Sequence, residues 1–179
     1  PNAANKGNFI PPLLKERGLG GEAVEAASLL ILDGAMGTMI QRFCLTEADF
    51  RGSVMAESKT LQKGNNDLLN LTRPDVVREI HRRYLEAGAD FIETNTFSSQ
   101  CISMSDYGCE HLCTQLNIEG ARLTRAEADF FTKQTPGKPR YVLGSVGPTN
   151  RTCSLSPDVS DPALRTLNFD TLSAAYREQ

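Results

Sequence analysis

The sequence has no apolar stretch long enough to cross a membrane and no excess of basic residues. Its longest nearly uninterrupted apolar stretch, Ala26 to Leu32, is far shorter than the roughly 20 residues that span a bilayer. The 19 Lys and Arg residues are outnumbered by 22 Asp and Glu residues, so no basic field exists to bind a phosphate backbone. We therefore expect neither a membrane nor a nucleic acid among the partners.

The sequence also lacks the spacings typical of metal sites and disulfide frameworks. It contains five cysteines, at positions 44, 101, 109, 113 and 153, and this odd number includes no Cys-x-x-Cys pair. Cys109 and Cys113 stand four apart on a predicted helix and could in principle bind a metal, but we interpret them as small apolar residues of that helix. The cysteine pattern predicts a reducing, cytoplasmic compartment.

Three short apolar segments have the length and composition of buried parallel strands. They are residues 29–32, 91–92 and 141–146. Polar or small residues follow each of them: Asp33-Gly34, the run Glu93-Thr94-Asn95-Thr96, and Gly147 to Asn150. We expect the first segment to be buried on both faces.

Helical patterns separate these segments. One helix is predicted to begin at Pro74, because proline fits a first helical turn, and to end at Gly88. Its apolar stripe, which includes Tyr84, repeats at helical spacing. A second predicted helix covers roughly Ser105 to Lys133, and we expect Phe130 to be in the core, on the same stripe as Leu112, Leu116, Leu123 and Ala126. A further helix is predicted from Phe169.

Alternating strands and helices indicate a parallel α/β protein, and two architectures compete. An open, doubly wound nucleotide binder has a G-x-G-x-x-G turn after its first strand. Here the turn Asp33–Thr38 has a different spacing, and no Gly-Lys-Ser/Thr follows it. A (β/α)8 TIM barrel instead places polar residues at the carboxyl ends of its strands, so we favour the barrel. Since a full barrel needs about 250 residues, we expect a truncated one: residues 29–179 form the first three or so βα units, after a lead-in of residues 1–28 without clear structure.

Several motifs resemble the cobalamin-dependent methionine synthase family and follow its order. They are Asp33–Gln41, Lys63–Asp67, Ala87–Phe97, Gly147–Arg151 and Ser156–Val159. The resemblance covers about Leu29 to Gln179 and implies the amino-terminal part of a homocysteine-binding (β/α)8 barrel. It further implies a methyltransferase that moves a methyl group from methylcobalamin, regenerated from 5-methyltetrahydrofolate, to the zinc-bound thiolate of homocysteine, giving methionine. The cobalamin and folate domains of the intact protein become the expected partners.

In that family, the zinc-binding cysteines come from later strands. None of the cysteines here stands at a matching position, so we assign no metal ligand and no catalytic residue, and we expect the 179-residue chain alone to be inactive. One alternative is a stand-alone homocysteine methyltransferase that uses betaine or S-methylmethionine. Another is a non-catalytic, truncated binding fragment. The motifs Lys63–Asp67 and Gly147–Arg151 favour the multidomain relative.

Asp33 is the leading candidate for substrate binding. The resemblance implies that its carboxylate pairs with the ammonium group of homocysteine, whereas the simpler alternative is a local turn in which it accepts backbone N–H bonds. Gly34 and Ala35 have small side chains, which let backbone N–H groups approach a substrate carboxylate.

The polar run after the second strand supplies the rest of the predicted substrate set, Thr94, Asn95 and Thr96. Strand alternation places Thr94 with Thr96 on one side and Glu93 with Asn95 on the other, and the sequence leaves open which pair faces the barrel mouth. For residues 65–67, we prefer a role in helix capping and loop packing.

Overall fold

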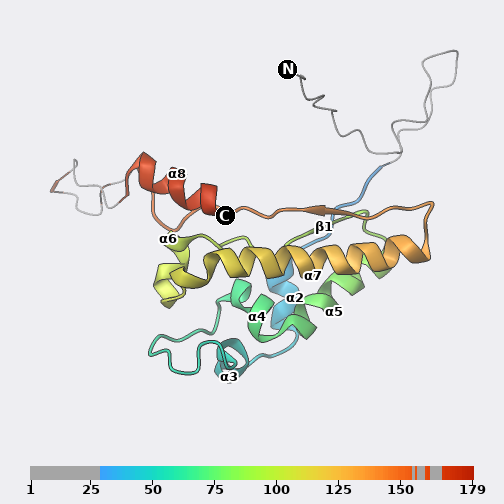
Figure 1. Ribbon diagram of the computed structural model, residues 1–179, viewed down its shortest axis with the longest axis horizontal. Coiled ribbons are helices and arrows are strands. Elements are labelled where there is room, and N and C mark those ends of the chain that lie inside the picture. Colours follow the sequence, from blue (N-terminus) through green and yellow to red (C-terminus); the bar gives the residue numbers. More distant parts are fainter. Residues whose placement is uncertain (1–28, 155, 157–159, 162–166) are drawn as a thin grey trace, which may run out of the picture.

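The computed structural model describes residues 29–154, 156, 160, 161 and 167–179, so the expectations for residues 1–28 and for part of the Ser156–Val159 motif lie outside it. Two strands and several helices alternate along the chain (Figure 1). The strands are β1 (Phe91–Glu93) and β2 (Tyr141–Leu143). The helices are α2 (Met36–Gln41), α3 (Glu47–Arg51), α4 (Leu69–Thr72), α5 (Pro74–Glu86), α6 (Cys101–Met104), α7 (Cys113–Gln134) and α8 (Phe169–Glu178), with 3-10 turns η1 (Asn66–Leu68), η2 (Ser105–Tyr107) and η3 (Glu110–Leu112).

Strand β1 lies between two parallel neighbours. On one edge it pairs with β2, with Phe91 opposite Tyr141 and Glu93 opposite Leu143. On the other edge Leu32 forms a parallel bridge with Phe91. The three predicted strand segments therefore lie side by side in chain order, although β2 ends at Leu143, earlier than expected.

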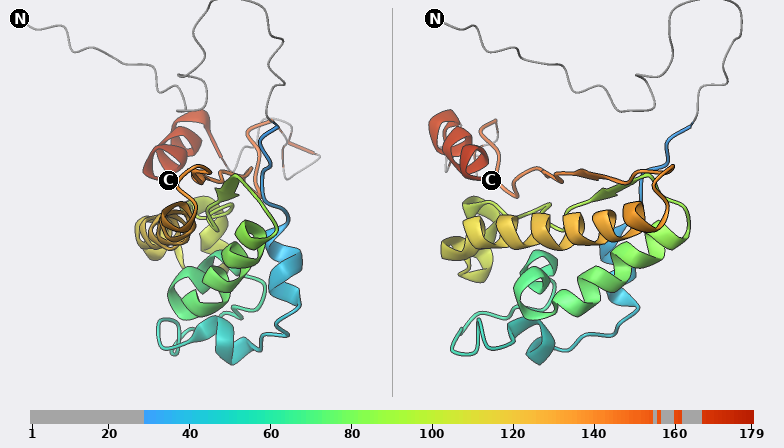
Figure 2. Two further views of the ribbon diagram at one scale, coloured as in Figure 1. Left: turned by 90° about the vertical axis from the view of Figure 1, so that its right-hand side faces the viewer. Right: turned by 45° about the vertical axis from the view of Figure 1, so that its right-hand side comes forward.

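Helices α5 and α7 pack on one face of this strand arrangement and lie below the strands in Figure 1; Figure 2 shows the same from two other directions. One apolar cluster joins Leu85 of α5, Ala128 of α7 and Ile92 of β1, with Val142 of β2 packed against it. A doubly wound sheet carries helices on both faces, whereas a barrel carries them on its outer face alone. The placement of α5 and α7 on one face agrees with the predicted barrel, but the described residues form only a two-stranded sheet with one bridged neighbour and do not close a ring.

Helix α5 confirms the most specific prediction of local structure. The helix begins at Pro74, so the proline occupies its first turn as predicted. Val77, Ile80 and Leu85 on its apolar stripe are fully or almost fully buried. Gly88, directly after the helix, has φ +107°, a conformation that favours glycine. Together with α2, α5 builds a core cluster in which Tyr84 is partly buried.

The expected burial of the first apolar segment is wrong. Leu29 is 90% exposed and Ile31 is 58% exposed, and only Leu32 forms a bridge to a strand. The physical reason is that, within the described part of the chain, this segment has a strand neighbour on one edge alone. Nothing described covers its remaining apolar surface.

The predicted helix from Ser105 to Lys133 is also wrong in part. Gly108 has φ +65° between two short 3-10 turns, so the continuous helix α7 begins only at Cys113. Phe130 is 52% exposed rather than in the core. The buried face instead carries Thr124 and Glu127, because α5 presents polar partners to it: Thr124 Oγ1 lies 3.1 Å from His81 Nε2, and Glu127 pairs with Arg82 at 2.7 Å.

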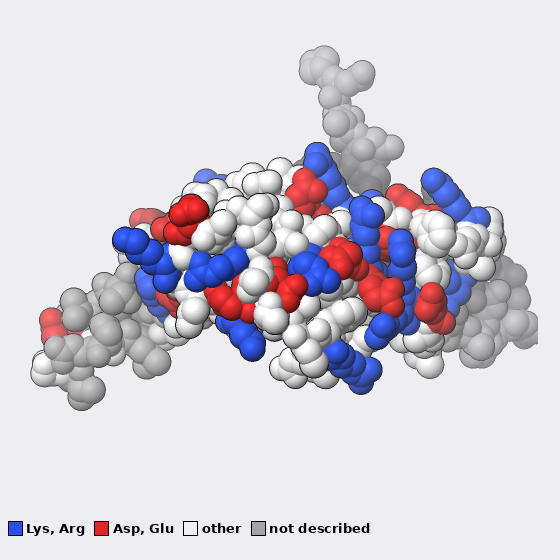
Figure 3. All heavy atoms as spheres, turned by 90° about the horizontal axis from the view of Figure 1, so that it is seen from below, with Lys and Arg blue, Asp and Glu red and all other residues white. Residues whose placement is uncertain are grey.

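The outer helical surface carries charges of both signs in close alternation (Figure 3). Ion pairs link Arg83 to Glu79 at 2.8 Å and Arg125 to Asp129 at 2.7 Å. This mixed pattern is typical of a solvent-facing helical layer. Among the residues that the structure describes, no helix is long and apolar enough to cross a membrane.

Cys44 gives a test of backbone strain, since it is the one non-glycine residue in the described chain with positive φ, at +50°. A side chain in this region costs roughly 1–2 kcal/mol, and glycine escapes that cost. We expect Cys44→Gly to raise the free energy of unfolding by ~0.5–1 kcal/mol in urea titrations. Cys44→Ala is the matched control, because alanine keeps the strain; an equal gain in both variants would show that the thiol, and not the backbone, is responsible.

Candidate functional site

A cavity of about 490 Å³ opens at the carboxyl ends of the strands. Its walls come from residues 33–37, 64–67 and 93–95, and Tyr107 and Ser145 also contribute. This volume lies within the roughly 300–1,000 Å³ of typical small-molecule sites. The end of the strands is also where barrel enzymes place their functional residues.

Asp33 lines this cavity and ties the first segment to β1. Its backbone N–H donates to the carbonyl of Phe91 at 2.9 Å, and its Oδ2 accepts from the N–H of Glu93 at 3.0 Å. The partners of Asp33 are therefore some 60 residues away in the chain, which distinguishes it from a local turn residue. Burial, together with the charge of Glu93, raises the pKa of the Asp33 carboxyl to about 6, against the lowering effect of the Glu93 hydrogen bond.

Gly34 and Ala35 also line the cavity, as part of the turn into α2. A Cβ placed on Gly34 would lie 3.0 Å from the hydroxyl of Tyr84. The missing side chain at Gly34 thus makes room for Tyr84 of α5, whatever ligand the turn accommodates. This packing role was not foreseen from the sequence.

Thr94 and Thr96 hold the end of β2 against the end of β1. Their hydroxyl oxygens are 2.6 Å apart, Thr94 Oγ1 accepts from the N–H of Ser145 at 2.9 Å, and Thr96 Oγ1 donates to the carbonyl of Ser145 at 2.9 Å. The two side chains share one side, as alternation predicts. Thr94 lines the cavity, whereas Thr96 is buried outside its lining.

Asn95 is buried and fastens η1 to the end of β1. Its Nδ2 donates to the carbonyl of Asn66 at 2.8 Å and to Asn70 Oδ1 at 3.1 Å, while Asn70 Nδ2 donates back to the Asn95 carbonyl at 2.8 Å. Asn95 and Glu93 both line the cavity. This hydrogen-bond network holds in place the part of the cavity wall that Asn95 and Glu93 form.

Asp67 also belongs to the site, although the sequence suggested only local capping for this residue. Asp67 is 5% exposed and lines the cavity. Its Oδ2 accepts from the N–H of Ser98 at 2.7 Å and from the Ser99 hydroxyl at 2.9 Å, so its partners are not local. Burial raises the pKa of this carboxyl to about 6, and the hydrogen bonds from Ser99 and Ser98 lower it only partly. In the sequence, the signal for Asp67 as a site residue was the polar run 65–67, which stands directly before the apolar Leu68 and Leu69.

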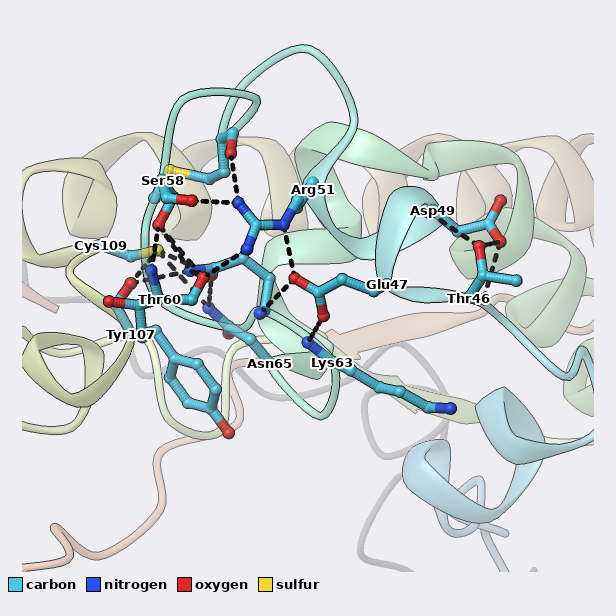
Figure 4. Close-up of polar contacts among 12 residues, drawn as sticks. Thr46, Glu47, Asp49, Arg51, Ser58, Thr60, Lys63, Asn65, Tyr107 and Cys109 are labelled. Atoms are coloured by element: carbon cyan, nitrogen blue, oxygen red, sulfur yellow. Dashed lines mark hydrogen bonds and ion pairs between the residues drawn. The ribbon is translucent and has the colours of Figure 1, made fainter.

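A second polar network positions the Lys63–Asp67 motif (Figure 4). Glu47 accepts from the N–H of Gln62 at 2.8 Å and from that of Lys63 at 2.7 Å, and Arg51 Nη2 donates to the carbonyl of Thr60 at 3.0 Å. The buried Gln62 side chain in turn donates to the carbonyl of Tyr107 at 2.9 Å. This network keeps Tyr107 beside the motif.

The described residues do not fit a zinc site. No group of three or more His, Cys, Asp or Glu side chains in that part of the chain stands together in a way that could hold a metal ion. Cys109 and Cys113 are buried, and burial raises their thiol pKa values to about 11 and about 12, so both remain protonated at neutral pH, when they are poor metal ligands.

Residues 30–179 match the family model for homocysteine S-methyltransferases. The chain belongs to the homocysteine S-methyltransferase family. The structure is also similar to the homocysteine methyltransferase MmuM from Escherichia coli, in its metallated form (TM-score 0.52, 23% identity, 76% of this chain and 40% of that chain). The oxidized form of MmuM matches with TM-score 0.50 and 24% identity, over 67% of this chain and 37% of that chain. The chain thus spans about two fifths of these relatives, and at such identities the likeness shows the fold alone.

The electrostatics of this cavity can be tested through Asp33. In ¹³C NMR titrations we expect its carboxyl to titrate near pH 6. Glu93→Gln removes the like charge and should lower the Asp33 pKa, whereas Glu119→Gln, at a partly exposed position of α7 where Glu119 pairs with Arg122, should leave it unchanged. The pKa of Asp33 is higher in the folded chain than its ordinary value of 3.8, so folding favours the protonated carboxyl. The contribution of Asp33 to the free energy of unfolding is therefore largest below about pH 4 and is lost as the pH rises through 6. An Asp33 that titrates at its ordinary value would contradict this description.

Proposed function

We propose that the chain forms the homocysteine-binding cavity of a methionine synthase-type homocysteine S-methyltransferase. The observation that carries the proposal is the position of Asp33, beside Glu93, in a cavity at the strand ends of a chain from this family. Among the described residues, no Lys, Arg or His forms an ion pair with Asp33. Its carboxylate is therefore free to receive a cation from a ligand.

Homocysteine is a zwitterion whose groups suit this cavity. Asp33 accepts hydrogen bonds from the ammonium group, which is a charge-assisted contact, and Glu93 adds negative potential. The turn 34–37 offers backbone N–H groups to the carboxylate. Apolar side chains of Met36, Phe97 and Met104 also line the cavity and suit the methylene chain and the sulfur.

The proposed reaction joins the homocysteine sulfur to a methyl carbon. The thiol gives up its proton to solvent water, because the thiolate is the reactive nucleophile. A sulfur electron pair forms the new S–CH3 bond as the bond between methyl group and donor breaks, and that bonding pair stays with the donor. This chain supplies the binding and orientation of the amino acid. In the intact family protein the resemblance implies zinc as the thiolate-stabilising ion, held by residues that this chain does not contain.

For the methyl donor, we propose methylcobalamin, regenerated from 5-methyltetrahydrofolate, with cobalamin and folate domains as partners in the cytoplasm. The motifs Lys63–Asp67 and Gly147–Arg151 support this choice. Residues 64–67 of the first motif line the cavity, and the carbonyl of Gly147, which opens the second motif, accepts a hydrogen bond from the Tyr176 hydroxyl of α8 at 2.8 Å. A betaine or S-methylmethionine donor and a non-catalytic binding fragment stay as alternatives.

The proposal predicts the effect of Asp33→Asn on ligand binding. The substitution removes the charge and keeps the size of the side chain, so homocysteine should bind roughly 10- to 100-fold more weakly in isothermal titration calorimetry, since hydrogen bonds to charged groups contribute roughly 1.5–3 kcal/mol. Asp129→Asn, which removes an exposed carboxylate of α7, is the matched control and should bind like the wild type.

Two results would contradict the proposed function. One is a wild-type chain that is folded by circular dichroism but takes up no homocysteine. The other is equal affinity in wild type and Asp33→Asn.

A further inference from the structure

The aromatic ring of Phe97 lies against the backbone of Gly147, in the segment after β2. A Cβ placed on Gly147 would lie 2.5 Å from Phe97 Cε1 and 2.6 Å from both Cδ1 and Cζ. These distances are far shorter than the roughly 3.5–4.0 Å at which carbon atoms pack. The N–H of Gly147 also donates to the carbonyl of Phe97 at 2.8 Å. Gly147 therefore binds the main chain of Phe97 and leaves room for its ring.

The backbone conformation of Gly147 does not explain why this residue is a glycine. Gly147 is not one of the described glycines with positive φ, the conformation that favours glycine. Gly144, three residues earlier in the same segment, has no atom within 4 Å of the place where its Cβ would be. The contact with the Phe97 ring is thus what distinguishes Gly147 from Gly144.

The end of α8 holds the same two places of the chain. The hydroxyl of Tyr176 donates to the carbonyl of Gly147 at 2.8 Å. Nε2 of Gln179 donates at 2.7 Å to the carbonyl of Thr96, the residue directly before Phe97. The end of α8 is therefore bonded both to the residue that the ring contacts and to the residue that precedes the ring in the chain.

Phe97 connects this arrangement to the cavity. Phe97 lines the cavity and is 54% exposed, whereas neither Gly147 nor Tyr176 belongs to the lining. An aromatic side chain in the wall suits a ligand that carries sulfur, because contacts between sulfur and aromatic rings are favourable. A change at Gly147 or Tyr176 can thus reach a ligand only by moving residues of the wall, and Phe97 is the residue that Gly147 contacts.

We propose that Gly147 and Tyr176 are positioning residues, which hold the Phe97 ring in the cavity wall where it contacts the side chain of the bound amino acid. Neither of them touches the ligand, and both act through Phe97. The ligand contact rests on the proposed function, whereas the position of the ring does not. The Gly147–Arg151 motif thereby gains a role in binding, although its first residue lies outside the cavity lining.

The position of the ring can be measured without a ligand, by NMR of the chain with ¹³C-labelled phenylalanine. The Phe97→Ala variant lacks the ring signals of Phe97 and so assigns them. We expect Gly147→Ala to shift these signals, because the new methyl group displaces the ring. Gly144→Ala is the matched control: it adds the same methyl group in open space and should leave the signals unchanged.

Tyr176→Phe tests the contribution of α8, since it removes only the hydroxyl that bonds to Gly147. We expect a smaller shift of the Phe97 signals than in Gly147→Ala. Thr114→Val is the matched control, because it removes a different hydrogen bond of α8, from Thr114 to Glu178 at 2.9 Å, and should leave the Phe97 signals unchanged.

Homocysteine affinity, measured by calorimetry, tests what the ring does for the ligand. We expect Phe97→Ala and Gly147→Ala each to bind roughly 3- to 10-fold more weakly, which corresponds to the loss of one sulfur–aromatic contact. In the Phe97→Ala background, Gly147→Ala should have no further effect, because the ring that it displaces is absent. An alanine that merely disturbed the loop would weaken binding equally in both backgrounds.

The proposal is overturned if Gly147→Ala leaves the Phe97 signals as unchanged as Gly144→Ala does, or if its effect on affinity is the same with and without the ring. If Gly147→Ala does not fold, Tyr176→Phe against Thr114→Val decides the same question. A wild-type chain that takes up no homocysteine would overturn the proposed function, and the ring signals would still decide the roles of Gly147 and Tyr176. Homocysteine binding that depends on Asp33, with unchanged ring signals, would overturn the positioning roles alone.

Discussion

The site depends on the pairing of Asp33 with β1. The backbone N–H of Asp33 bonds to Phe91, and its carboxylate accepts the N–H of Glu93. These two bonds place the turn 33–37 at the end of the strands, directly opposite the polar residues that follow β1. They continue the pairing of Ile31, whose carbonyl accepts from the N–H groups of Asp90 at 2.8 Å and Phe91 at 3.0 Å, and they complete one wall of the cavity.

The cavity walls combine rigid polar networks with carboxylates that lack cations. Thr94 and Thr96 fix β2, Asn95 fixes η1, and each of these side chains is buried and hydrogen-bonded. Asp33 and Asp67 differ from them, because burial raises both carboxyl pKa values to about 6. Neither carboxylate forms an ion pair with a described residue, and both line the cavity, which makes them the candidates for contact with a ligand.

The local parts of the fold could be predicted from the sequence. Helix α5 with Pro74 and Gly88, the positions of β1 and β2, and the placement of Asp33 at a strand end follow from short-range patterns. Contacts between distant segments could not: Asp67 meets Ser98, 31 residues later, and no local signal marks that partner. Phe130 was misplaced because the periodicity of α7 does not reveal that His81 and Arg82 of α5 attract its polar residues to the interface. The exposure of residues 29–32 depends on neighbouring strands, which a local pattern cannot supply.

A crystal structure of the chain with homocysteine tests the central claim most directly. We predict the amino nitrogen within hydrogen-bond distance of the Asp33 carboxylate, in the cavity at the carboxyl ends of the strands. Homocysteine bound elsewhere, or bound in the cavity with its amino group directed away from Asp33, would contradict the account.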